Sequence, residues 1–173
     1  MINFHKDFLS KELCNIIINR YNSDDVLEDA VSVNNSTLEK VQNYNFNKRK
    51  IVKVSPETSS ELKLVSSKIL ELINHNSEVK FEKIASFSFN KYREGDFLDW
   101  HSDLSEVRKG STKTVVIELN EEYTGGEFDY IIDGINHSLD KNAGSIFIFD
   151  STTKHRVREI KSGERFSLNC WPL

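Results

Sequence analysis

Two histidines, one carboxylate and one arginine have types and spacings that suit metal chemistry. His101 and Asp103 are separated by one residue, so in an extended chain their side chains point the same way. His155 follows later, at the start of a predicted strand. Two imidazoles and one carboxylate on one side of a metal ion leave its other side open, which is the ligand set of non-haem Fe(II) sites. Arg165 adds a planar fork of donors that suits a carboxylate.

The strands that would carry such a site have one polar and one apolar face. In the predicted strand Arg165–Trp171, the apolar face holds Phe166, Leu168 and Cys170, and the other face holds Arg165, Ser167, Asn169 and Trp171. The predicted strand Ile84–Tyr92 alternates in the same way and puts Asn90 and Tyr92 on its polar face. Two interpretations stay open: the polar faces are turned to water, or they line a wet cavity inside a barrel.

Helices are predicted early in the chain and strands later. Ser10 is a suitable N-cap for an amphipathic helix over 11–20, and a second amphipathic helix is predicted over about 58–74. Residues 22–48 are polar and rich in asparagine, and we interpret them as a mobile lid or substrate loop. Alternation and glycine turns predict six strands, at Ile84–Tyr92, Lys113–Leu119, Glu127–Ile132, Ser145–Phe149, His155–Ile160 and Arg165–Trp171. This order predicts an α+β domain that is mainly β.

Composition excludes several classes of protein. The chain has 173 residues, 38% hydrophobic and 29% charged, with a net charge of −4, which is typical of a globular domain. Strong binding to nucleic acid is not expected, because such binding depends on positive charge. No apolar run is long enough to cross a membrane, and the first residues show no secretory signal. Cys14 and Cys170 form neither a disulfide framework nor a zinc knuckle, so we expect a cytoplasmic protein.

An ordered series of motifs resembles the Fe(II)- and 2-oxoglutarate-dependent dioxygenases. The series is Tyr92, His101-Ser102-Asp103, Gly125-Gly126-Glu127, Ala143-Gly144, Phe149, His155-Arg156-Val157, Arg165-Phe166-Ser167-Leu168 and Trp171. Within that family the sequence is most similar to the prolyl 4-hydroxylase-like and PKHD-type hydroxylases. The resemblance extends over residues 84–173, and more loosely over 1–21 and 57–74.

The resemblance implies a double-stranded β-helix, or jelly roll, with the N-terminal helices packed on one sheet. The whole of 1–173 would be a single domain, with 1–80 as helical support and a mobile loop and 81–173 as the jelly-roll core. The implied cofactors are Fe(II), 2-oxoglutarate as co-substrate and O₂, with ascorbate as a candidate addition.

The resemblance also assigns roles to six residues. His101, Asp103 and His155 would be the iron ligands. The distal carboxylate of 2-oxoglutarate would be bound by Arg165, Ser167 and Tyr92.

The implied reaction is hydroxylation of a C–H bond with release of succinate and CO₂. The branch suggests a prolyl residue or a proline-like substrate, presented by a peptide or a small molecule. Asp103 favours hydroxylation over halogenation, because halogenating relatives lack this carboxylate. Two alternatives stay open: the same chemistry on a nucleobase or a small metabolite, and a non-catalytic metal-binding jelly roll that acts as a sensor or binding module. The basic cluster 48–50 permits an acidic peptide or a nucleotide, and the oligomeric state is open.

Glu118 departs from the family pattern, in which many relatives carry a tyrosine at this position that touches the distal carboxylate. A carboxylate here would repel the co-substrate unless it pairs with Arg165 or Lys113, or unless the strand turns it outward. The tightness of 2-oxoglutarate binding is therefore open, and Glu118 is the best support for the non-catalytic alternative.

Overall fold

The computed structural model describes residues 3–33, 40–41, 43, 45–75, 77–104 and 111–173. The main sheet has seven strands, in the order β1 (Asn3–His5), β13 (Ile146–Asp150), β9 (Lys113–Glu118), β16 (Arg165–Cys170), β7 (Phe87–Tyr92), β6 (Lys50–Val54) and β2 (Glu28–Asp29). The second sheet has five, in the order β12 (Ile135–Ser138), β11 (Phe128–Ile132), β14 (His155–Val157), β8 (Phe97–His101) and β5 (Asn47–Lys48). Two further pairs are β10 (Tyr123–Gly125) with β15 (Ile160–Gly163), and β3 (Ser32–Val33) with β4 (Lys40–Val41).

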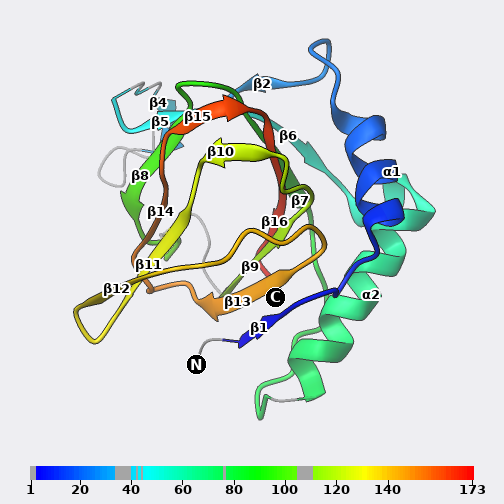
Figure 1. The fold of residues 1–173 in the computed structure, drawn as a ribbon. Coiled ribbons are helices and arrows are strands. Elements are labelled where there is room, and N and C mark those ends of the chain that lie inside the picture. Colours follow the sequence, from blue (N-terminus) through cyan, green and yellow to red (C-terminus); the bar gives the residue numbers. More distant parts are fainter. Residues whose placement is uncertain (1–2, 34–39, 42, 44, 76, 105–110) are drawn as a thin grey trace.

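The two large sheets face each other and form the barrel seen in Figure 1. The described strand pairs are antiparallel throughout. Apolar side chains of both sheets meet inside the barrel: Val116, Phe147 and Phe149 from the main sheet, and Leu98, Phe128 and Val157 from the second. This architecture confirms the predicted jelly roll.

Two helices cover the outer face of the main sheet (Figure 1). Helix α1 (Lys11–Tyr21) begins after Ser10, whose hydroxyl accepts a hydrogen bond of 3.3 Å from the Leu13 amide, as predicted for an N-cap. A short 3₁₀ turn, η1 (Pro56–Thr58), precedes helix α2 (Ser60–His75). In the described part of the chain, no helix is long and apolar enough to cross a membrane.

Strand β16 lies between β9 and β7 in the main sheet, and its two faces have different surroundings. Leu168 and Cys170 belong to the core beneath the helices, together with Phe89 of β7. Asn169 and Trp171 line a pocket inside the barrel. The polar face of this strand therefore lines a cavity, which decides between the two interpretations of the sequence.

Several elements differ from the sequence-based expectation. The strand predicted at 155–160 is two strands, β14 and β15, because the pairing partner changes between them. Strands β6 and β8 were not among the six predicted strands. The predicted mobile loop at 22–48 contains β2, β3, β4 and β5, and residues 34–39, 42 and 44 of it lie outside the described residues.

Gly144 allows the chain before α1 to approach the sheet closely. Its φ angle is +83°, and a Cβ at this position would lie 2.1 Å from the carbonyl oxygen of Leu9. The Leu9 amide donates to the Gly144 carbonyl at 2.9 Å, and the Gly144 amide donates to the Glu118 carbonyl at 2.8 Å. Only glycine meets both requirements, a positive φ and no side chain.

Asp129 of β11 ties the second sheet together. Its side chain is fully buried and accepts hydrogen bonds from the Nε atoms of Arg156, at 2.8 Å, and Arg158, at 2.7 Å. The Ser138 hydroxyl of β12 also donates to it. Burial alone would raise the pKa of this carboxyl, but the bonds from Arg158, Ser138 and Arg156 hold the pKa below its usual value.

Candidate active site

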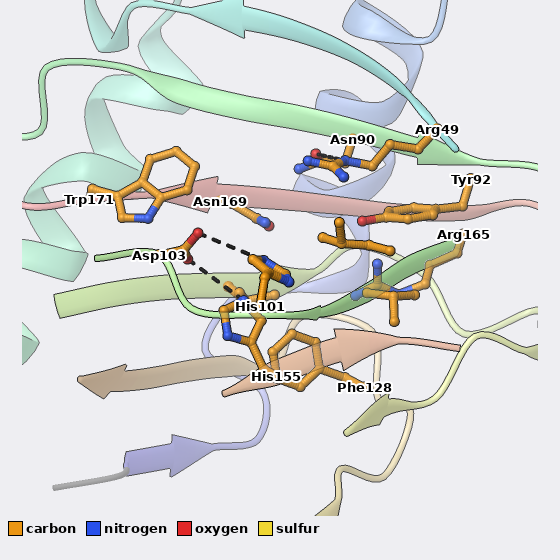
Figure 2. Close-up of a pocket in the computed structure, with 13 residues that line it drawn as sticks. Arg49, Asn90, Tyr92, His101, Asp103, Phe128, His155, Arg165, Asn169 and Trp171 are labelled. Atoms are coloured by element: carbon orange, nitrogen blue, oxygen red, sulfur yellow. Dashed lines mark hydrogen bonds and ion pairs between the residues drawn. The ribbon is translucent and has the colours of Figure 1, made fainter. Parts of the chain in front are cut away.

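The pairing of β8 with β14 brings the two histidines together. His101 ends β8 and His155 begins β14, and the two residues lie directly opposite each other, with ring centroids 4.1 Å apart. Asp103 follows two residues after His101, and its amide donates to the Ser151 carbonyl at 2.9 Å. The His101 Nε2 lies 3.8 Å from Asp103 Oδ1, and the His155 Nε2 lies 3.7 Å from Asp103 Oδ2 (Figure 2). One ligand atom from each residue lies within 4.8 Å of the others.

Backbone carbonyls fix which nitrogen of each histidine faces the cluster. The Nδ1 of His101 is 2.8 Å from the Asp99 carbonyl oxygen, and the Nδ1 of His155 is 3.0 Å from that of Thr153. A carbonyl can only accept, so each Nδ1 carries a proton and each Nε2 faces the cluster. The pKa of His101 is lowered to about 4, mainly by burial and secondly by the neighbouring His155. This imidazole is therefore neutral at neutral pH.

Asp103 is held by a buried hydroxyl network. The Thr114 hydroxyl on β9 donates to Asp103 Oδ2 at 3.0 Å and lies 3.1 Å from the Ser151 hydroxyl. Thr114 is fully buried. Phe128 stacks on the ring of His155, with centroids 5.4 Å apart and an interplanar angle of 19°. These contacts fix the carboxylate and one imidazole from outside the cluster, as second-layer residues do in metal sites.

The three side chains fit a divalent transition metal. They offer two imidazole Nε2 atoms and one carboxylate, which is the 2-His-1-carboxylate set that leaves coordination positions open. All three residues line one pocket inside the barrel, so the open side faces that pocket. The structure thus brings together the three residues that the sequence singled out.

Arg165 lines the same pocket from the start of β16 and is almost fully buried. The Tyr92 ring packs 5.0 Å from its guanidinium carbon, and Figure 2 shows the Tyr92 hydroxyl directed into the pocket. Among the described residues, the Nε and Nη1 of Arg165 and the hydroxyl of Ser167 have no hydrogen-bond partner. Buried donors without partners cost about 1–3 kcal/mol each, so this group fits a ligand that brings acceptor oxygens. A dicarboxylate such as 2-oxoglutarate meets that requirement.

Glu118 lies beside this group. Arg165 donates through Nη2 to Glu118 Oε1, and the Tyr123 hydroxyl donates to Glu118 Oε2 at 3.4 Å. Burial acts to lower the pKa of Arg165, but the negative charge of Glu118 raises it overall. The other partner considered from the sequence, Lys113, pairs with Asp150 instead. Of the three arrangements considered for Glu118, the structure shows the pair with Arg165.

Arg49 is a second arginine in the pocket. The sequence indicated it only as part of the basic cluster 48–50, not as a residue of the pocket wall. Its Nε donates to the Asn90 side-chain oxygen at 3.1 Å, and its Nη1 donates to that of Asn47. The neighbouring Lys48 and Lys50 pair with aspartates outside the pocket. Every other arginine in the described ranges has a carboxylate partner, whereas Arg49 has none there.

The comparisons agree with this fold. A sequence profile of the 2OG-Fe(II) oxygenase superfamily matches residues 87–172. A PKHD-type hydroxylase from Prochlorococcus marinus is 33% identical over 62% of this chain and 50% of its own length. Another, from Acaryochloris marina, is 33% identical over 51% of this chain and 42% of its own. The chain thus spans about half the length of these curated relatives or less.

Solved structures with the same fold include two prolyl hydroxylases. A prolyl-4-hydroxylase from Pseudomonas putida superposes with a TM-score of 0.81 and 21% identity, over 99% of this chain and 91% of that one. A prolyl hydroxylase from Trichoplax adhaerens, solved with a peptide fragment of the hypoxia inducible factor oxygen degradation domain, superposes with a TM-score of 0.83 and 18% identity. This superposition covers 99% of this chain and 83% of that one.

A jelly roll with a His-Asp-His cluster facing an arginine across a barrel pocket defines the class of 2-oxoglutarate oxygenases. The chain belongs to the 2OG-Fe(II) oxygenase superfamily, and within it the chain is similar to PKHD-type hydroxylases. The superfamily implies Fe(II), 2-oxoglutarate and O₂ as cofactors, as the sequence analysis predicted.

Proposed function

We propose that the protein is an Fe(II)- and 2-oxoglutarate-dependent dioxygenase that hydroxylates a prolyl residue or a proline-like substrate, with release of succinate and CO₂. One observation carries the proposal: three side chains that suit Fe(II) converge at a pocket that is also lined by Arg165, whose Nε and Nη1 donors lack partners among the described residues. The prolyl substrate is supported by the names of the relatives and of the structures with the same fold.

His101 and His155 would hold Fe(II) through Nε2, and Asp103 would hold it through its carboxylate. Arg165 and Ser167 would donate hydrogen bonds to the distal carboxylate of 2-oxoglutarate, with the Tyr92 hydroxyl as the third predicted contact. When bound, the iron and 2-oxoglutarate supply the activation of O₂ that places one oxygen atom in succinate and one in the substrate.

The contribution of the protein is to orient these groups and keep water away from them. The two carbonyls that accept from the Nδ1 atoms fix both imidazole rings before any ligand binds. Phe128 stacks on His155, and Phe149 packs against the same ring edge-on, with centroids 4.9 Å apart. The apolar side chains exclude water from one side of the site, which favours controlled oxidation over side reactions.

The test is a turnover assay on the purified chain. Anaerobic protein is loaded with Fe(II) and 2-oxoglutarate, exposed to O₂ with a panel of proline-containing peptides, and analysed for succinate and for a mass gain of one oxygen. We expect both products from the wild type and neither from His155→Ala. His137→Ala is the matched control, because His137 is an exposed histidine on β12. Full turnover by His155→Ala would refute the assignment.

Arg49 supports a substrate with a negative group near the oxidised position. It is a cation in the pocket wall that hydrogen-bonds to two amide oxygens and lies 5.8 Å from the centroid of the Tyr92 ring, with no carboxylate partner among the described residues. A carboxylate on the substrate would complete its hydrogen bonding. Peptides with Asp or Glu beside the proline should therefore be hydroxylated more efficiently than peptides with Lys there. Arg49→Gln should remove this preference and Lys48→Gln should keep it; equal rates for both peptide classes in the wild type would contradict this preference.

A second candidate function is a metal-binding jelly roll without oxygenase activity. The pair between Arg165 and Glu118 favours it, because the chain already supplies a carboxylate to the arginine that would anchor the co-substrate. This alternative predicts metal uptake without consumption of 2-oxoglutarate under any condition in the turnover assay. Detectable succinate that requires Fe(II) would exclude it.

Two further parts of the proposal are the domain organisation and the location. We propose that 1–173 acts as a single domain, because the helices share one continuous core with the main sheet. A reducing, cytoplasmic location is supported by Cys14 and Cys170, which are both free and buried. One cooperative unfolding transition would support the first proposal, and a fluorescent fusion observed in cells would test the second.

A further inference from the structure

Glu118 shares the pocket side of the main sheet with the residues proposed to bind the co-substrate. Directly opposite residues on neighbouring antiparallel strands point to the same face of a sheet, and Glu118 of β9 lies opposite Ser167 of β16. Arg165 is two residues from Ser167, so it shares that face. The side chains of Arg165 and Glu118 are 1% and 10% exposed, so their ion pair is shielded from water.

A hydroxyl group holds the Glu118 carboxylate from its other side. Tyr123 donates to Oε2 while Arg165 donates to Oε1, so both carboxylate oxygens are engaged. Burial and the neighbouring Glu118 raise the pKa of Tyr123, which keeps its hydroxyl protonated and able to donate. Glu118 is therefore a fixed part of the site, and its charge offsets that of Arg165.

The ion pair with Glu118 changes what Arg165 can offer to a ligand. The Nε and Nη1 of Arg165 and the Ser167 hydroxyl can still donate hydrogen bonds, since none has a partner among the described residues. The positive charge of Arg165, however, is already balanced by Glu118. A distal carboxylate bound to Arg165 would lie beside a second negative charge, that of Glu118, in a buried site where like charges repel strongly. The other cation of the pocket, Arg49, is already hydrogen-bonded to Asn90 and Asn47.

We propose that Glu118 is an internal counter-ion of the co-substrate anchor, which weakens 2-oxoglutarate binding and lowers the discrimination between co-substrates with and without a distal charge. The inference rests on the proposed function, because it takes Arg165 as the anchor. It assigns Glu118 a role in co-substrate specificity. The occupancy of the site would then change over a range of 2-oxoglutarate concentrations in which a site with an unpaired arginine would already be saturated.

The experiment measures binding, independently of turnover. Calorimetry under anaerobic conditions, with Fe(II)-loaded protein, gives the Kd of 2-oxoglutarate and of 2-oxopentanoate, a five-carbon 2-oxo acid without the distal carboxylate. In the wild type we expect the two Kd values to differ by less than about tenfold. In Glu118→Gln, the Kd of 2-oxoglutarate should fall by about tenfold or more, and that of 2-oxopentanoate should stay the same.

Glu82→Gln is the matched control, because it removes one negative charge from an exposed position and should change neither Kd. Thermal unfolding gives a second measure of Glu118→Gln. Without the co-substrate this variant should melt lower than the wild type, since Arg165 loses its buried counter-ion, and 2-oxoglutarate should raise its Tm more than that of the wild type.

The outcomes separate this inference from the proposed function. An unchanged or higher Kd of 2-oxoglutarate in Glu118→Gln would overturn the role of Glu118 and leave the proposed function intact. Absence of 2-oxoglutarate binding to both proteins would overturn the proposed function, and this inference with it. If Glu118→Gln does not fold, the wild type alone decides: a preference for 2-oxoglutarate over 2-oxopentanoate above about a hundredfold would overturn the inference.

Discussion

Thr114→Val tests whether the hydroxyl network behind Asp103 holds the metal cluster in place. The substitution keeps the shape of the side chain and removes the hydroxyl that donates to Asp103 Oδ2 at 3.0 Å. A hydrogen bond to a charged group contributes about 1.5–3 kcal/mol, and each 1.4 kcal/mol changes an equilibrium constant about tenfold. If the whole contribution serves to orient the carboxylate, the Kd for Fe(II) should rise by about 10- to 150-fold. This overlaps the roughly 10- to 100-fold loss that is typical when a residue that orients a metal ligand is mutated.

The assay is anaerobic calorimetry with Fe(II) on the wild type, Thr114→Val and Thr124→Val. Thr124 is a matched control because its hydroxyl also bonds to a serine, at 2.7 Å, but at the exposed position of strand β10. Thermal unfolding shows whether Thr114→Val is folded, since the buried Ser151 hydroxyl also loses a partner. A folded Thr114→Val that binds Fe(II) within about twofold of the wild type would refute the reasoning.

Three predictions concern stability. Gly144→Ala places a methyl group against the Leu9 carbonyl and should lower the free energy of unfolding by about 2–4 kcal/mol, measured by urea denaturation; an unchanged midpoint would contradict the close approach. Asp129 has a lowered pKa, so its stabilisation is complete above the ordinary carboxyl pKa of about 4 and is lost as the pH falls toward the folded pKa. Urea unfolding at pH 5 and pH 3 should therefore show a smaller fall for Asp129→Asn than for the wild type. Ser10→Ala removes the N-cap bond to the Leu13 amide and should cost about 0.5–1 kcal/mol, whereas Ser10→Asp should cost less.

Part of the candidate metal site could be predicted from the sequence, because the spacing of His101 and Asp103 follows directly from strand geometry. His101 and Asp103 are close along the chain, and an extended backbone points them the same way. His155 joins them because β14 pairs with β8 in a register that sets the two histidines opposite each other. The alternation in β16 likewise indicated which of its side chains share a face, although only the fold shows that this face lines a cavity.

Arg49, Thr114 and Glu118 show what the sequence could not reveal. Arg49 lies in the one-residue gap between β5 and β6, where no periodicity indicates the direction of a side chain. Thr114 looks like an ordinary strand residue until the fold places Asp103 beside it. The departure at Glu118 was visible, but three arrangements were possible, and the pairing of β9 with β16 decides between them.

The shortest strands were also beyond prediction. Strands β2, β3, β4 and β5 have two residues each, which is too short for an alternating pattern to appear. Strands β2 and β5 form because the longer strands β6 and β8 offer unpaired edges, a property of the assembled sheet, whereas β3 and β4 pair with each other. The two helices, in contrast, have enough turns for an apolar stripe to be recognised. Their predicted first and last residues therefore differ from the observed ones by no more than two positions.

Strand β16 has a consequence for how the protein tolerates mutation. Its even-numbered positions 166, 168 and 170 pack beneath the helices, whereas its odd-numbered positions 165, 167 and 169 face the barrel interior. A saturation library of this one strand should therefore separate into two phenotypes that alternate residue by residue. Variants at even positions would lower the abundance of the protein in cells. Variants at odd positions would be inactive, and they would stay abundant at 167 and 169 but not at 165, where Glu118 would lose its buried counter-ion.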